Sequence, residues 1–170
     1  MVVRVLDPTD AAAFRTLRIR ALREHPEAFG RTPEEVDSVE VWTERLRVDT
    51  GADLDFVLGA FEADTLVGTA GCHRDHGAKQ RHIAYVWGMY VVPDQRGKGL
   101  GRRLLLAALE RARAWLEVEQ VWLDVTTGNI AARALYVSCG FKSIAIKPRV
   151  LKVGDHYHDE ELMALALKPS

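Results

Sequence analysis

The sequence contains little cysteine and no long apolar run, and each absence excludes a class of protein. Its 170 residues include two cysteines, Cys72 and Cys139, which lie far apart and form no C-x-x-C pair. Small disulfide scaffolds are much richer in cysteine, so we expect a reducing compartment. The apolar run at residues 2–6 is too short for a signal peptide, and no stretch approaches the roughly 18 apolar residues of a membrane span. We therefore expect a cytoplasmic protein with no membrane partner.

An excess of one charge is missing as well. The chain has 23 Lys and Arg residues against 24 Asp and Glu residues, which gives a formal net charge of -1. Nucleic-acid-binding proteins usually show a basic excess, because contacts with phosphates supply most of their affinity. The charge balance therefore predicts no nucleic-acid partner. Repeats, low-complexity runs and linkers are also absent, so we expect a single domain over residues 1–170.

Periodicity and turn residues predict helices alternating with strands. Helices are expected over residues 11–23, from Thr32-Pro33 to about Val48, from Leu100 to about Val118, and over 129–139. Strands are expected over residues 2–6, 55–62, 65–74, 83–92, 120–126, 141–150 and 156–167. Strand–helix–strand alternation occurs only in the middle of the chain, with hairpins on both sides. This order predicts an α/β fold with a mixed, largely antiparallel sheet of six or seven strands flanked by about four helices.

Apolar spacing also predicts the buried faces of two segments. On the long helix that starts at Leu100, we expect the buried side to include Leu104, Leu105, Ala108, Leu109, Ala112 and Leu116. Cys139 precedes Gly140 at the end of a short helix, and we expect it to be a small buried residue.

The most informative segment is a glycine-rich turn between a strand and the long helix. Residues 96–103 read Arg-Gly-Lys-Gly-Leu-Gly-Arg-Arg, so three alternate glycines are interleaved with four cations. Free N–H groups at a helix start attract anions, whereas each cation placed there is unfavourable by about 0.3–1 kcal/mol. The spacing matches neither a P-loop nor the dinucleotide fingerprint G-x-G-x-x-G. It predicts a different anion-binding turn, with a flexible turn carrying solvated arginines as the structural alternative.

This turn resembles the pyrophosphate-binding turn of the GNAT acetyltransferases, R/Q-x-x-G-x-G/A, with Arg96, Gly99 and Gly101 at the matching positions. Other segments resemble the family in the same order. They are residues 87–93 before the turn, Asn129 to Tyr136 followed by Gly140-Phe141, and residues 159–163 near the end. The resemblance covers nearly the whole chain. It implies an enzyme that uses acetyl-CoA as co-substrate and transfers the acetyl group to a primary amine.

The resemblance also implies which residues bind acetyl-CoA. The pantetheine arm would lie between two splayed strands against backbone groups, and the pyrophosphate would lie on the turn. The implied cofactor-binding residues are Met89, Tyr90, Val91, Arg96, Gly97, Lys98, Gly99, Leu100, Gly101, Arg102, Asn129 and Ala132.

The resemblance assigns catalysis to Tyr136, whose hydroxyl would lie near the thioester sulfur. Ordinary pKa values of about 10 for tyrosine and 8.5 for a thiol make Tyr136 a hydrogen-bond donor to the departing thiolate rather than a complete acid. A core position for Tyr136 and an N-cap role for Asn129 are the structural alternatives.

The general base is not identified by the sequence, because the strand over residues 83–92 carries no Asp or Glu. Candidates are His73, His82, Tyr85, Asp124, His156 and Asp159. His73 and His76 have no evident third ligand, so no metal site is expected.

In the family the acceptor lies between the first two helices and the loop that joins the last two strands. Here these are residues 25–35 and 152–158, where Glu27, Glu34, Glu35 and Asp155 could attract a cationic amine. The acceptor is a small molecule or a protein amine, and a homodimer is compatible with the sequence.

Three functions are compatible with these residues. The expected one is direct attack of the amine in a ternary complex, since no nucleophile is placed for a covalent intermediate. The second is an acyl-CoA-binding sensor or partner module of the same fold. The third is an enzyme that binds NAD on the glycine turn, which the glycine spacing disfavours.

Overall fold

The computed structural model describes residues 1–47, 55–74 and 77–168. Within these ranges, seven strands form one sheet in the order β1-β2-β3-β4-β5-β7-β6. The strands are β1 (Val2–Val5), β2 (Asp55–Glu62), β3 (Thr65–Arg74), β4 (Ile83–Val91), β5 (Gln120–Thr126), β6 (Lys142–Val153) and β7 (His156–Ala166). The α-helices are α1 (Ala11–Glu24), α2 (Val39–Arg45), α3 (Leu100–Ala114) and α4 (Ile130–Ser138). Neighbouring strands are antiparallel except β4 and β5, so the predicted fold is confirmed.

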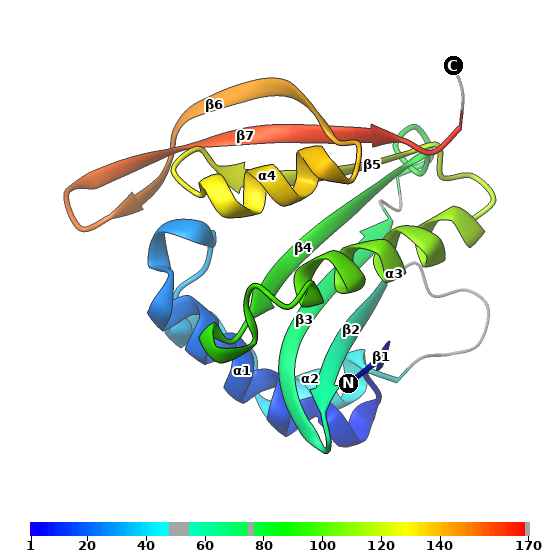
Figure 1. Ribbon diagram of the computed structural model, residues 1–170, viewed down its shortest axis with the longest axis vertical. Coiled ribbons are helices and arrows are strands. Elements are labelled where there is room, and N and C mark those ends of the chain that lie inside the picture. Colours follow the sequence, from blue (N-terminus) through cyan, green and yellow to red (C-terminus); the bar gives the residue numbers. More distant parts are fainter. Residues whose placement is uncertain (48–54, 75–76, 169–170) are drawn as a thin grey trace.

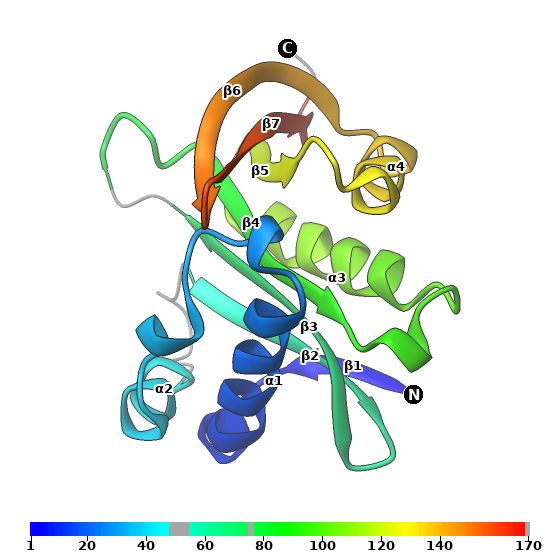
Figure 2. The ribbon, with the colours of Figure 1, turned by 90° about the vertical axis from the view of Figure 1, so that its left-hand side faces the viewer.

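The helices cover both faces of the sheet. Figure 2 shows α1 and α2 on one face and α3 on the other, with α4 beside the β5–β7 end. The predicted apolar face of α3 is confirmed for its first five members, which are at most 1% exposed: Leu104, Leu105, Ala108, Leu109 and Ala112. Leu116 was wrongly expected on that face and is 90% exposed. The helix ends at Ala114 because Trp115 is extended, so helical spacing no longer applies at Leu116.

The second helix is shorter than expected. Thr32 and Glu35 form a reciprocal capping box around a single 3₁₀ turn at Pro33–Glu35. Val36 then adopts extended backbone, and the chain starts α2 afresh at Ser38, whose hydroxyl accepts a hydrogen bond from the Val41 N–H. A continuous helix from residue 32 was therefore wrong, and its expected end at Val48 lies outside the described residues.

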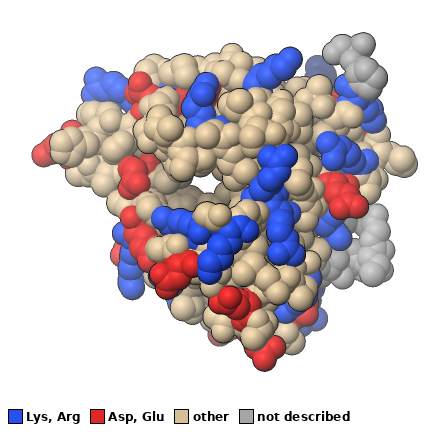
Figure 3. Space-filling view, viewed as in Figure 1, with Lys and Arg blue, Asp and Glu red and all other residues tan. Residues whose placement is uncertain are grey.

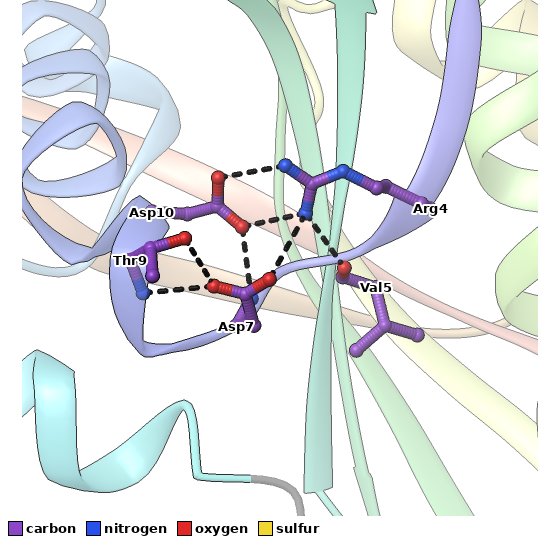
Figure 4. Close-up of polar contacts among 5 residues, drawn as sticks. All are labelled: Arg4, Val5, Asp7, Thr9 and Asp10. Carbon is purple, nitrogen blue, oxygen red and sulfur yellow. Dashed lines mark hydrogen bonds and ion pairs between the residues drawn. The ribbon is translucent and has the colours of Figure 1, made fainter.

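A partly buried ion pair joins the first strand to the start of the first helix (Figure 4). The Asp10 carboxylate accepts hydrogen bonds from both terminal nitrogens of Arg4, at 2.6 and 2.8 Å, and from the Asp7 N–H at 2.8 Å. Asp10 is 7% exposed, and the Arg4 guanidinium lowers the pKa of its carboxyl. This contact fixes where α1 starts on the sheet.

The two central strands diverge, and this divergence creates the functional site. β4 pairs with β5 over only three residue pairs, from Ile83–Gln120 to Tyr85–Trp122. β5 instead pairs along its whole length with β7. Figure 1 shows β4 and β5 separating towards the end of β4, with the start of α3 beside the opening. Among the described residues, the far half of β4 therefore has no strand partner on that side.

None of the helices in the described ranges combines the length and apolar character that a membrane span requires.

Candidate functional site

A groove of about 860 Å³ lies where β4 and β5 diverge. Its walls come from the second half of β4, the glycine turn, the start of α3, α4 and the segment after α1. Every residue predicted to bind acetyl-CoA, except Lys98, lines it, and so does the predicted catalytic Tyr136. The Lys98 ammonium instead donates to the Gln95 side-chain oxygen at 3.0 Å. The fold thus brings together residues separated by almost fifty positions in the sequence.

The glycine turn presents its backbone to this groove. Gly97 and Gly99 have φ values of +75° and +76°, a conformation that residues with a Cβ rarely adopt. A Cβ at either glycine would meet no atom within 4 Å, so the space beside the turn is open. Gly99 is the N-cap of α3, and its carbonyl accepts from the Arg103 N–H at 3.1 Å. The N–H groups of the first helical turn have no acceptor within the helix and are available to an anion.

The cations around this turn have no acidic partner. Arg96 donates to the Val91 carbonyl at 2.9 Å, Arg102 to the Ser138 hydroxyl at 2.9 Å, and Arg103 to the Met1 carbonyl at 3.3 Å. Among the residues that the structure describes, neither these three nor Lys98 forms an ion pair with a carboxylate. Figure 3 shows Lys and Arg side chains gathered along a hollow in this face of the molecule. The site therefore carries uncompensated positive charge at the positive end of a helix.

A bulge in β4 faces the same groove. In the pairing with β3, Trp87 lies opposite Gly71 and Tyr90 opposite Thr69, so Gly88 and Met89 share one position on the partner strand. Gly88 has a φ of +63°, which explains why a glycine stands in this otherwise aromatic strand. Gly88 and Met89 both line the groove, so the bulge forms part of its wall. The sequence interpretation missed it, although an isolated glycine within a strand is its usual signal.

The first turn of α4 is fixed by Asn129. Its side-chain oxygen accepts a hydrogen bond from the Ala132 N–H at 3.2 Å, which is an N-cap. The structural alternative for Asn129 is therefore present, and the same residue also lines the groove. One turn further, Arg133 forms two hydrogen bonds with the buried Glu161 of β7, at 2.6 and 3.1 Å. The Arg133 guanidinium lowers the pKa of Glu161 and anchors α4 beside the groove.

Tyr136 lies in the groove wall and is buried. Its ring packs near Phe141, with 6.1 Å between centroids. Burial raises the pKa of Tyr136 to about 12, so the hydroxyl keeps its proton at neutral pH. Within the described ranges, no protein group forms a hydrogen bond with this hydroxyl. It is therefore able to donate to a bound ligand.

Tyr90 differs from Tyr136 in its contacts. Its hydroxyl donates to the Glu24 carboxylate at 2.6 Å, and burial together with this contact raises the pKa of Tyr90 to about 12. The side chain thus ties β4 to the end of α1, which leaves only the backbone of Tyr90 for the predicted binding role.

Among the candidate bases, Asp124 alone lines the groove. Its carboxylate contacts the Lys147 ammonium at 2.7 Å. His73 lines a separate hollow, whereas the other candidates lie in the walls of neither: His82, Tyr85, His156 and Asp159. The Asp159 carboxylate accepts from the Arg149 N–H at 2.8 Å, which is a structural role.

Two histidines in the groove were not singled out from the sequence. His25 lies 3.0 Å from Arg96 through Nε2 and 3.4 Å from Glu27 through Nδ1. His158, on β7, is half-buried in the groove wall. The sequence contained no local signal for either position, because both depend on how β7 and the segment after α1 meet the end of β5.

The acidic residues expected to attract the acceptor amine do not all lie in the groove. Glu27 lines the groove, whereas Glu34, Glu35 and Asp155 do not. Of the two free thiols, Cys72 is buried, which raises its pKa, and Cys139 is half-buried rather than buried as expected. No group of three or more metal-ligating side chains occurs in the described part of the chain, and His76 lies outside it.

Comparisons with known proteins agree with this geometry. A model of the acetyltransferase (GNAT) family matches residues 16–141. The chain is 40% identical over 96 residues to the N-alpha-acetyltransferase RimI of Mycobacterium tuberculosis, covering 56% of this chain and 58% of that protein. It is 34% identical over 142 residues to the mycothiol acetyltransferase of Thermobispora bispora, covering 82% of this chain and 45% of that protein. The chain thus spans about half the length of these curated relatives.

A solved structure is similar over the full chain. The acetyltransferase YncA of Salmonella typhimurium, determined with its cofactor acetyl-CoA, has a TM-score of 0.85 and 25% sequence identity. The similarity covers 100% of this chain and 95% of that one.

Proposed function

Since this chain belongs to the acetyltransferase (GNAT) family, we propose that it transfers the acetyl group of acetyl-CoA to a primary amine. The observation that carries this proposal is the meeting of three features in one groove. These are the cations of the glycine turn, which form no ion pair with a carboxylate of the described residues, the β4 bulge, and the hydroxyl of the buried Tyr136. Support also comes from the relatives, two of which are named as acetyltransferases of this kind.

The groove fits the pyrophosphate end of acetyl-CoA. The backbone N–H groups at the start of α3 and the side chains of Arg96 and Arg102 supply donors and positive charge. Open space beside Gly97 and Gly99 allows close approach to the backbone. A negatively charged ligand would also offset the unfavourable placement of cations at a helix start, worth about 0.3–1 kcal/mol each.

Acetyl-CoA supplies the thioester that the amine attacks. Along the bulge, the backbone of Met89, Tyr90 and Val91 would hold the pantetheine arm and polarise the thioester carbonyl. Tyr136 would donate a hydrogen bond to the sulfur as it leaves. With its pKa at about 12, Tyr136 lies about 3.5 pH units above an ordinary thiol, so complete proton transfer would be uphill by about 5 kcal/mol.

The amine must lose a proton before it attacks. His25 and Glu27 in the groove contact each other, and His25 also contacts Arg96, so the groups considered for this step are His158 and Asp124. Asp124 is engaged by Lys147, whereas His158 has no ion pair among the described residues. We therefore assign the proton-accepting role to His158, acting directly or through a water molecule.

Release of free thiol from acetyl-CoA tests this function. The purified protein is incubated with acetyl-CoA and a panel of small amines and peptides with free N-termini, and the thiol is measured with a colour reagent. Amine-dependent thiol release that falls in Tyr136→Phe is the expected result. Tight binding of acetyl-CoA with no release for any amine would instead support the sensor or partner module.

A further inference from the structure

A second hollow of about 440 Å³ lies beside the groove, between α1, α2 and the strands β2 to β4. We call it the side chamber. Trp87 lines both the groove and the chamber. Arg18 lines the chamber, and its Nη1 lies 3.5 Å from the position of a Cβ built on Gly88, at the β4 bulge. The chamber therefore adjoins the place where the proposed reaction would occur.

The chamber walls are largely aromatic and aliphatic. Trp42 and Trp87 are stacked with 6.5 Å between ring centroids and an interplanar angle of 28°. Further apolar wall residues are Leu6, Val36, Leu46, Phe56 and Val57. The volume lies within the range of about 300–1,000 Å³ that is usual for small-molecule pockets. Such walls suit a compact apolar group.

Arg18 is a half-buried cation, and no acidic side chain among the described residues forms an ion pair with it. Its guanidinium lies over the Phe29 ring at 4.7 Å, and Nη1 is buried without a hydrogen-bond partner among the described residues. Burial, and then the nearby charge of Arg31, lowers the pKa of Arg18 to about 10, which leaves it charged at neutral pH. Arg31 also lines the chamber and forms no ion pair within the described ranges. Two guanidiniums thus repel each other in the wall of the chamber, the half-buried Arg18 and the exposed Arg31.

The other charged or titratable groups of the chamber wall are two carboxylates, Asp37 and Asp55, and two bases, Arg45 and His73. Asp37 is paired with Arg45 at 2.7 Å. Asp55 stands exposed at the start of β2, beside His73 on the neighbouring strand. A further buried donor, the Trp42 indole N–H, also has no acceptor among the described residues. Unpartnered buried donors are unfavourable, so this wall favours a ligand that brings acceptor atoms and negative charge.

A carboxylate has the required chemistry, because its two oxygens match the planar fork of a guanidinium. We propose that the acceptor is an amino acid with an apolar side chain, whose carboxylate binds Arg18 and Arg31. Its side chain lies in the chamber against Trp42 and Trp87, and its amine is directed past Gly88 into the groove. This inference rests on the proposed function and specifies its substrate class.

Matched pairs of acceptors test the carboxylate directly. Phenylalanine, methionine and leucine are each compared with the amine that lacks only the carboxylate, namely phenethylamine, 3-(methylthio)propylamine and isoamylamine. For at least one pair, kcat/KM for the amino acid is expected to exceed that for the amine by about 100-fold or more, because the amine leaves the cationic wall unpartnered. Equal or higher values for all three amines would overturn the inference and leave acetyl transfer intact.

Arg18→Met separates substrate recognition from a structural role. Methionine keeps an unbranched apolar chain over Phe29 and removes the charge. The variant is expected to lose the preference for the amino acid over the matching amine, through a higher KM for the amino acid. Its melting temperature should equal or exceed that of the wild type, because a half-buried cation with a buried, unpartnered Nη1 has been removed. A lower melting temperature with unaltered acceptor preference would show that Arg18 is structural and would overturn the inference.

Two controls complete the test. Arg23→Met makes the same change on the exposed surface of α1, outside both cavities, and is expected to behave as the wild type. Calorimetric titration with each amino acid in the presence of CoA measures binding without turnover. Absence of binding for all three amino acids would overturn the inference, whereas absence of acetyl-CoA binding in a separate titration would overturn the proposed function itself.

Discussion

Replacing Tyr136 by phenylalanine separates the proposed catalytic role from the core role of this side chain. The change removes one hydroxyl and keeps the ring that packs near Phe141. No group in the described part of the chain forms a hydrogen bond with that hydroxyl, so the free energy of unfolding is expected to stay within about 0.5 kcal/mol of the wild type. Affinity for acetyl-CoA is likewise expected to be unchanged, since the hydroxyl is assigned only to the leaving sulfur.

The expected kinetic effect follows from the charge of the departing thiolate. A hydrogen bond to a charged group contributes about 1.5–3 kcal/mol, which corresponds to a loss of about 10- to 150-fold in kcat. Since burial holds the pKa of Tyr136 at about 12, its ionisation should not reduce kcat below about pH 11.

Thiol release at saturating substrates measures kcat, and calorimetry measures the dissociation constant of acetyl-CoA. An equal loss in turnover and affinity, or an unchanged kcat, would refute the leaving-group role. A marked fall in the melting temperature would show instead that the hydroxyl supports the fold.

Further predictions concern the glycine turn and the anchor of α4. Gly99→Val should raise the acetyl-CoA dissociation constant about tenfold or more, because its side chain occupies the open space beside the turn. Gly154→Val, at another positive φ with open space, should show a similar loss of stability of about 1–2 kcal/mol and unchanged binding. Arg102→Met should weaken acetyl-CoA binding about two- to fivefold at low salt and less at high salt, as titrations at two ionic strengths would show. Arg133→Met should reduce the free energy of unfolding at pH 7, because the buried Glu161 loses its partner. Arg133 lowers the pKa of Glu161, so the stabilisation by this ion pair is present above the unfolded pKa of about 4.3 and disappears as pH falls through the folded pKa. The loss of unfolding free energy caused by Arg133→Met, measured by urea unfolding, should therefore be larger at pH 7 than at pH 3. An equal loss of unfolding free energy at pH 7 and pH 3 would contradict the role of the Arg133–Glu161 pair. Unchanged acetyl-CoA affinity in Gly99→Val would contradict the role of the glycine turn.

Elements that are determined by residues close together in the sequence were predictable. The hairpin of β2 and β3 was predicted with its observed bounds, and the turn before α3 was predicted from its glycines and cations. Both depend on neighbouring residues only. The same locality explains the error at residues 32–48, because a capping box around a single 3₁₀ turn has the same sequence signal as the start of a long helix.

Features that depend on long-range packing were not predictable. The ion pair of Lys147 with Asp124 joins β6 to β5, and it changes the interpretation of the one predicted base that lines the groove. The contacts of Arg18 are another example. Only the packing of α1 places its guanidinium over the Phe29 ring and close to Gly88 at the β4 bulge, in the wall of the chamber.

Calorimetric titration of the wild-type protein with acetyl-CoA, with NAD as the control ligand, is the measurement that matters most. We predict selective binding of acetyl-CoA that weakens as ionic strength rises, because uncompensated cations and helix N–H groups receive the pyrophosphate. Absence of binding to the folded protein, or equal binding of NAD, would contradict the assignment of the groove as the acetyl-CoA site.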